Sequence, residues 1–212
     1  MNRKLMLTAE FIIIFVLMPL IIFRFNSHAG RFVLPVIAAA TLYTVFILGR
    51  DRGFRWKDKW KLPEQRISLL RILPLFAAGS VFIFLFVRLT EPSLLFAFPS
   101  EKPVMWTVVM LFYPMLSALP QEIMFRVFFF RRYGELFGDK ALVPLSAAVF
   151  SLAHLFYGNP VAPVFSFFGG LIFAVTYSRT GSLTLTALEH ALWGNMLFTI
   201  GAGAYFYHGT IS

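Results

Sequence analysis

The chain has 212 residues, of which 58% are hydrophobic and only 14% are charged. Because a soluble domain carries about 25% charged residues, this composition predicts a polytopic membrane protein and argues against a water-soluble domain. The sequence has no cysteine, which excludes disulfides, thiolate nucleophiles and thiolate metal sites.

The net charge of +9 could indicate a nucleic-acid partner. Most Lys and Arg residues, however, lie in short segments beside apolar runs. This placement is typical of positive-inside orientation signals, and attraction to anionic lipid follows from it. We therefore expect the lipid bilayer, and no nucleic acid, as the surroundings of the chain.

A helical span needs about 20 apolar residues, and the apolar runs of the chain predict about seven such spans. The first run is longer than the apolar core of a secretory signal, so we expect a retained helix there. In chain order, the expected spans are residues 5–23, 32–49, 72–89, 104–133, 141–156, 161–177 and 182–205.

Residues 50–71, between the second and third expected spans, form the most basic stretch of the chain. Trp56 and Trp60 are interleaved with its Lys and Arg residues, which predicts an interfacial segment on the cytoplasmic side. The alternative interpretation of this stretch is a docking site for a partner. We expect a multi-pass protein of a prokaryotic plasma membrane, with this loop and the N-terminus cytoplasmic and the C-terminus outside.

Residues 104–133 have few polar breaks, so we expect one long kinked helix there or two helices end to end. Pro120 is suited to begin a helical turn and would leave Gln121 and Glu122 near its N-terminus. In a later span, the pair Gly169-Gly170 permits close helix packing.

The polar residues inside the spans form one chemically dense set. Glu122 and Arg126 lie four residues apart, which puts both on one helix face with the acid N-terminal to the base. Two later spans carry His154 and His190. At 1.5 Å per residue, Glu122, His154 and His190 lie about 15, 20 and 12 Å from the basic ends of their helices, in one slab of the membrane. Ionisable groups at this depth are usually kept for binding or chemistry.

This set predicts hydrolysis of a peptide bond within or at the membrane. A buried carboxylate such as Glu122 can act as general base toward water, and His154 can share that water. Arg126 would fix the carboxylate, while His190 and Asn195 would donate to the developing negative charge. In the alternative interpretation, Glu122 and Arg126 form only an ion pair that locks two helices together.

Two further groups leave alternatives open. Glu189 projects about 100° away from His190 on a helix and could orient that histidine, act as a second acid or face a polar cavity. Two His and one Glu are a known zinc ligand set. The chain has no HExxH motif and the three candidates lie on separate spans, so we expect no cofactor and keep zinc as the alternative. For His28 and His208 we expect no role in this site.

Three motifs follow one another on these spans: Gln121-Glu-Ile-Met-Phe-Arg126, Phe150-Ser-Leu-Ala-His154 and Glu189-His-Ala-Leu-Trp-Gly-Asn195. They resemble the EExxxR, FxxxH and HxxxN pattern of the CAAX protease and bacteriocin-processing (Abi) family of intramembrane glutamic endopeptidases. The resemblance covers residues 104–200. It implies that His154 is the partner of the attacking water, His190 an oxyanion donor and Arg126 a structural partner of the acids.

The chain departs from the family pattern at two positions. Gln121 stands where the pattern has its first acid, so either Glu122 takes over as the base or the chain has lost hydrolysis. Gly194 stands where Asn is expected. Asn195 then lies about 140° round the helix from His190 rather than about 40°, unless a local bulge brings it back.

We therefore expect an all-α integral membrane bundle in a single domain, residues 1–212. Residues 1–103 would hold the N-terminal helices and the basic loop, and residues 104–205 the family-like core. The expected function is metal-independent endoproteolysis of a membrane-associated peptide or protein. The alternatives are an inactive relative with a binding, immunity or scaffolding role and, less consistent with the absence of repeat halves, a transporter.

Overall fold

The computed structural model describes residues 3–24, 33–62 and 65–206. Within these ranges all the regular structure is helical, as the composition predicts, and no strand is present. The α-helices are α1 (Arg3–Phe11), α2 (Met18–Arg24), α3 (Val33–Gly49), α4 (Gln65–Thr90), α5 (Ala97–Glu101), α6 (Pro103–Tyr113), α7 (Leu119–Glu122), α8 (Phe129–Phe137), α9 (Asp139–Leu152), α10 (Val161–Thr180) and α11 (Leu183–Ile200). Short 3₁₀ or π segments (η) join several of them.

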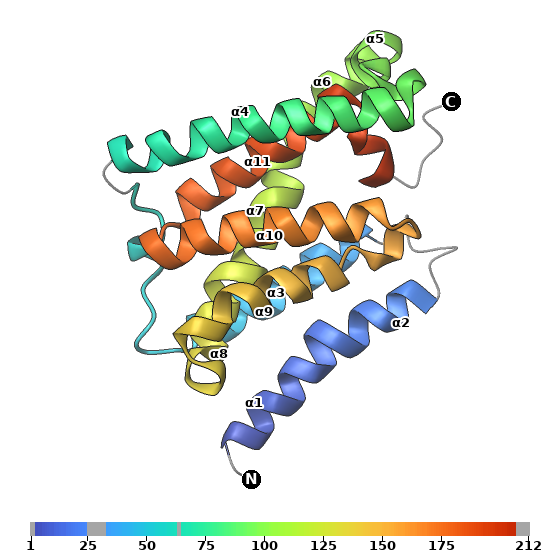
Figure 1. Ribbon diagram of the computed structural model, residues 1–212. Helices are drawn as coiled ribbons and strands as arrows, with labels where there is room; N and C mark the ends of the chain where they lie inside the picture. Colours follow the sequence, from blue (N-terminus) through green and yellow to red (C-terminus); the bar gives the residue numbers. More distant parts are fainter. Residues whose placement is uncertain (1–2, 25–32, 63–64, 207–212) are drawn as a thin grey trace.

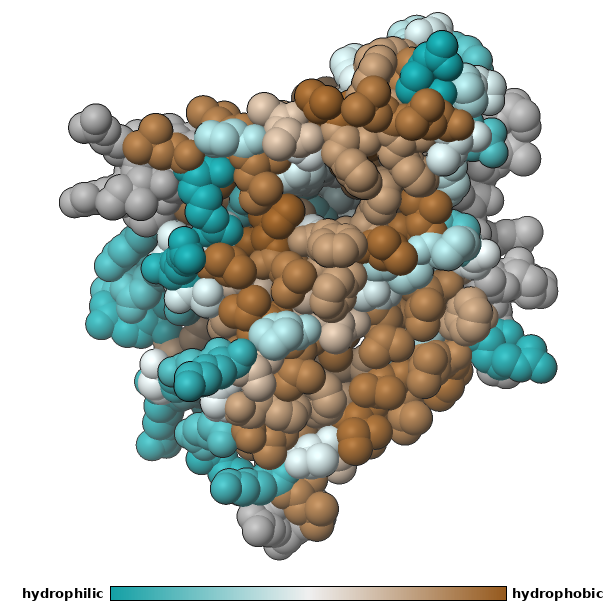
Figure 2. Space-filling model, viewed as in Figure 1, coloured by the Kyte–Doolittle hydropathy of each residue, from teal (hydrophilic) through white to brown (hydrophobic). Residues whose placement is uncertain are grey.

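Five helical runs among the described residues are long and apolar enough to cross a membrane: Arg3–Arg24, Leu70–Thr90, Pro103–Phe137, Asp139–Tyr157 and Val161–Thr180. They correspond to five of the seven expected spans and confirm a multi-pass membrane protein. The second expected span is a shorter apolar helix, α3, and the last is α11, whose polar residues keep it outside this set. The count of seven is therefore not confirmed. Figure 2 shows a broad apolar surface across the helices, which suits lipid.

The predicted long helix is present as one continuous run, Pro103–Phe137, with two π-helical segments inside it. The first, η5 (Pro114–Ala118), begins at a proline, and the second, η6 (Ile123–Phe128), follows Pro120 closely. Proline lacks an N–H and its ring crowds the preceding turn, so local widening beside it is the expected response. Pro120 lies in the first turn of α7, with Glu122 in the same turn, as predicted. Because the backbone of Ala118 before it is already helical, this turn continues the long run.

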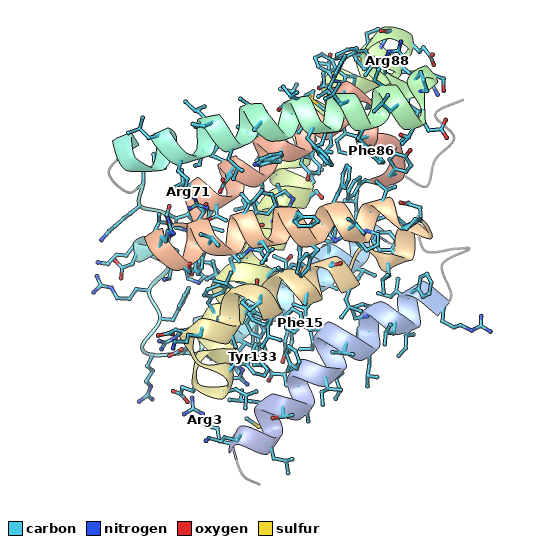
Figure 3. All side chains as sticks on the ribbon, in the orientation of Figure 1. Arg3, Phe15, Arg71, Phe86, Arg88 and Tyr133 are labelled. Atoms are coloured by element: carbon cyan, nitrogen blue, oxygen red, sulfur yellow. The ribbon has the colours of Figure 1, made fainter. Side chains whose placement is uncertain are left out.

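The other helices pack around this run. In Figure 1, α9 and α10 lie side by side, and α11 lies next to α4. The close approach predicted for the glycine pair occurs at Gly170, where a Cβ would lie only 3.0 Å from the Ala147 Cα of α9. On the opposite side, Phe15 of the first span packs edge-on against Tyr133 of α8, with ring centroids 5.8 Å apart (Figure 3).

One flank of the bundle collects the ends of several helices and the basic loop, and it forms the hydrophilic side at the left of Figure 2; we call it the basic flank. Arg3 pairs with Glu135 at 3.0 Å, and Asp51 pairs with Arg131 at 2.7 Å. These contacts place the start of α1, the basic loop and α8 together. Figure 3 shows Arg71 near this flank and Arg88 at the far end of α4.

The basic loop also forms hydrogen bonds with the start of α11. Backbone carbonyls of three consecutive residues, Lys59, Trp60 and Lys61, accept hydrogen bonds from the first residues of that helix or from its N-cap. The donors are the Leu183 N–H at 2.8 Å, the Thr184 hydroxyl at 2.9 Å and the Ser182 hydroxyl at 2.6 Å. Loop and helix are thus fixed to each other, and α11 is the helix that carries His190.

Candidate active site

Glu122 lies at the junction of the long central helix with α11. Its side chain is 0% exposed. Its Oε1 accepts a hydrogen bond from Nδ1 of His190 at 2.8 Å, and its Oε2 lies 3.3 Å from Nε of Arg126. The pairing of Glu122 with Arg126 is the one expected from their spacing. The pairing with His190 links two helices that lie far apart in the sequence.

Arg126 is also 0% exposed, and it extends the group to α9 and α10. Its Nη1 donates to the Ser146 hydroxyl at 2.9 Å and to the Phe125 carbonyl at 3.3 Å. The guanidinium lies over the Phe150 ring, 5.0 Å from its centroid, and 5.8 Å from that of Phe173. A buried charge of this kind is tolerated only when it is paired, and Glu122 supplies the opposite charge.

The two histidines pack against the same phenylalanine from different helices. The Phe150 ring centroid lies 4.6 Å from that of His154 and 5.6 Å from that of His190. His190 is further stacked on Phe173, with centroids 4.5 Å apart and an interplanar angle of 18°. His154 lies just beyond the end of α9, in the turn that leads to a 3₁₀ segment at Leu155–Tyr157, and the fifth span extends through both to Tyr157. Phe150 packs along His154, as expected.

Hydrogen bonds define which nitrogen of each imidazole is available. Nδ1 of His154 lies 2.7 Å from the Phe150 carbonyl, and a carbonyl oxygen can only accept, so this nitrogen carries a proton. Nδ1 of His190 is held by Glu122 in the same way. In both residues Nε2 has no hydrogen-bond partner among the described residues. Each histidine therefore keeps Nε2 for a ligand.

Both histidines line a cavity of ≈ 1290 Å³ bounded by side chains of α4, α6, α9, α10 and α11. Most of its wall is apolar, and its polar members include Tyr113, Ser117 and Gln121. Glu122 and Arg126 are absent from this wall and lie behind it. An apolar chain segment could occupy such a cavity with a polar bond placed at the two imidazoles.

Gln121, at the position of the first acid in the family pattern, faces the cavity that Glu122 does not reach. Its Nε2 donates to the Ser117 hydroxyl at 2.7 Å. Its Oε1 is buried and has no hydrogen-bond partner within the described part of the chain. Successive helical residues point about 100° apart, which explains why these neighbours face different surroundings.

Asn195 is turned away from the cavity. Its Nδ2 donates to the Met110 carbonyl of α6 at 3.2 Å, and Gly194 lines the cavity instead. The bulge that could have restored the family spacing is absent, because α11 is a regular α-helix from Leu183 to Ile200. The donor role of Asn195 stays a prediction, and it would require the amide to leave Met110.

Glu189 is 3% exposed and is not part of the cavity wall. Both of its carboxylate oxygens are buried without a hydrogen-bond partner among the described residues, and the carboxylate that orients His190 is Glu122. Within residues 3–24, 33–62 and 65–206, no three His, Asp or Glu side chains are grouped to hold a metal ion. His28 and His208 lie outside the described residues.

The motifs did not indicate Tyr113, Ser117 or Ser146. Ser117 and Ser146 are serines in apolar helices, where a hydroxyl commonly bonds the backbone of its own helix, so neither stands out in the sequence. Tyr113 lies in an apolar run and belongs to none of the three motifs. Its only local signal is the following residue, Pro114, which begins a π-helical segment of the kind found at functional sites.

The part of the chain that holds these site residues is also the part that is similar to a known family. Residues 103–196 match the family described as Type II CAAX prenyl endopeptidase Rce1-like, and this range contains all three motifs. No curated protein and no solved structure shows a significant match to the chain. This match confirms the family predicted from the motifs: residues 103–196 are similar to the CAAX-type membrane endopeptidases.

Proposed function

We propose that the chain is an intramembrane endopeptidase that hydrolyses a peptide bond of a membrane-associated peptide or protein with Glu122, His154 and His190. The observation that carries the proposal is the arrangement of the two histidines. They come from different helices, pack on one Phe150 ring and line one apolar cavity, each with Nδ1 already engaged.

In this proposal His154 Nε2 takes a proton from water as the water oxygen attacks the peptide carbonyl carbon. His190, in its doubly protonated form, donates Nδ1–H to Glu122 and presents Nε2–H to the oxyanion. When the tetrahedral intermediate collapses, the C–N bond breaks and His154 returns the proton to the leaving amine. Two products result, a new carboxylate and a new amine.

Glu122 acts here through His190 and does not touch water. The direct base role expected from the motif is replaced by this indirect one because both carboxylate oxygens face protein groups and the side chain is off the cavity wall. An acid that fixes the tautomer and orientation of a histidine is a general feature of hydrolytic sites. Gln121, which cannot serve as a base, is then compatible with catalysis.

The cavity supports a substrate with an apolar segment next to the scissile bond. The family description names prenyl endopeptidases, so a prenylated C-terminal peptide is one candidate, and an unmodified apolar peptide is the other. We further propose that the basic flank is cytoplasmic, as Lys- and Arg-rich loops generally are. Because the sequence has no cysteine, single cysteines introduced at Arg52 and Arg88 would report the two sides directly.

The test is cleavage of quenched peptides, prenylated and unprenylated, by purified protein in liposomes, with and without a chelator. Wild type, His154→Ala and Gln121→Glu are compared. Chelator-resistant cleavage by wild type that His154→Ala abolishes supports the proposal. If wild type cleaves no peptide but Gln121→Glu does, the proposal is contradicted, and the protein is a catalytically inactive family relative with a binding role. Activity lost on chelation contradicts the metal-free mechanism and returns zinc as the cofactor.

A further inference from the structure

The proposed reaction requires hydrogen-bond donors to the oxyanion in addition to His190. The side-chain amide expected in this role, that of Asn195, does not reach the cavity. Asn195 donates to the Met110 carbonyl and does not line the cavity. The amide of Gln121 donates to Ser117. Gly194, which lies four residues after His190 and so on the same face of α11, has no side chain.

The space beside Gly194 is filled by Tyr113 of α6. A Cβ added to Gly194 would overlap the Tyr113 ring and its hydroxyl oxygen, so the phenol lies directly on the α11 backbone at this position. Tyr113 and Gly194 both line the cavity, as do His154 and His190. The Tyr113 hydroxyl therefore occupies the place from which a side chain at position 194 would have reached the cavity.

Tyr113 is held in this position by rings on two sides. Its centroid lies 6.1 Å from that of His190 and 5.4 Å from that of Phe198, both in edge-to-face geometry. Its hydroxyl has no hydrogen-bond partner among the described residues, unlike the amides of Gln121 and Asn195. A fixed phenol with an uncommitted O–H in an apolar site is a suitable donor to a developing negative charge.

We propose that Tyr113 is a catalytic residue that donates its O–H to the oxyanion alongside Nε2–H of His190. The proposal rests on the endopeptidase function above and adds a donor to it. The phenol gives no proton away: its hydrogen bond to the carbonyl oxygen strengthens as the tetrahedral intermediate forms and weakens as the C–N bond breaks. Gly194 is then needed because any side chain there would displace the phenol.

The test is the kinetics of Tyr113→Phe, which keeps the ring and its packing but removes the donor. Loss of one oxyanion donor lowers kcat by roughly 10²–10³-fold, and we expect this loss with KM changed less than about threefold. Tyr205→Phe is the matched control, since Tyr205 lies on the 3₁₀ segment η8 (Ala202–Phe206) and does not line the cavity. We expect it to retain wild-type kcat.

A second variant tests the role of Tyr113 even if Tyr113→Phe disturbs the packing around the ring. In Tyr113→Ala/Gly194→Asn, the ring is removed and an amide is placed on the same face of α11, so we expect kcat at least about tenfold above that of Tyr113→Ala. Tyr113→Phe with near-wild-type kcat would overturn the role of Tyr113 while leaving the endopeptidase intact. A wild-type protein silent on every peptide would overturn both proposals.

Discussion

Glu122 and His190 are joined by a 2.8 Å hydrogen bond between a fully buried carboxylate and an imidazole on the cavity wall. The bond connects the long central helix with α11 and leaves one nitrogen of the imidazole for the cavity. Arg126 balances the carboxylate from within its own helix, at 3.3 Å.

Glu122→Gln should lower kcat by on the order of 10²-fold or more. The amide oxygen can still accept Nδ1–H of His190, but the negative charge that supports a doubly protonated imidazole is gone. Rates are measured per folded protein, with Glu189→Gln as control because Glu189 is a buried acid off the cavity wall. Equal rates for Glu122→Gln and wild type would remove Glu122 from the mechanism.

The ion pair should show strong energetic coupling. Removing one partner of a buried pair costs about 3–5 kcal/mol because the other charge is left uncompensated. We expect Glu122→Gln and Arg126→Met each to lower the free energy of unfolding by this amount, and the double variant to lose much less than the sum. Unfolding in lipid or detergent measures the cycle, and additive losses would contradict the pairing.

Ser182→Ala should loosen the start of α11. The Ser182 hydroxyl accepts the Leu185 N–H at 3.1 Å and donates to the Lys61 carbonyl at 2.6 Å, so one change removes both the N-cap and a bond to the basic loop. Loss of an N-cap costs about 0.5–2 kcal/mol. Faster hydrogen exchange over residues 183–186 is the expected signature. Ser178→Ala is the control, since that hydroxyl bonds only its own helix, and equal exchange in both variants would refute the capping role.

The contact between the basic loop and α8 should depend on pH. The hydrogen bond from Arg131 holds the pKa of Asp51 below its ordinary value, so ionised Asp51 stabilises the fold above the unfolded pKa of about 3.9. This contribution is lost as pH falls through the folded pKa. Because the Asp51 side chain is 35% exposed, it amounts to less than about 1 kcal/mol.

Asp51→Asn removes the titrating group and is the variant that checks this contact. The stability difference between wild type and Asp51→Asn should shrink as pH falls from about 6 to 3. Unfolding at the two pH values measures the difference. A constant difference would show that the carboxylate does not titrate against Arg131.

Much of the fold could be predicted because its signals are local. The apolar runs give the helices, and the spacing of Glu122 and Arg126 gives their ion pair, since residues four apart on a helix are neighbours wherever it packs. The paired glycines likewise indicated the close packing of α10 on α9, which occurs at Gly170.

The partner of Glu122 could not be predicted from the sequence. The choice between His154 and His190 depends on how the central helix is rotated between its two π-helical segments and on where α9 ends, and neither leaves a clear mark in the sequence. The same holds for Tyr113, which reaches the site only because α6 crosses α11 at Gly194. Contacts of this kind are set by packing between distant helices.

The most direct test of the account is the single-turnover cleavage rate of His154→Ala against wild type, in liposomes and in the presence of a chelator. If His154 Nε2 accepts the proton from water, the rate should fall by roughly 10²–10⁴-fold while peptide binding is preserved. A variant that binds and cleaves the peptide like wild type would contradict a mechanism in which His154 activates the water.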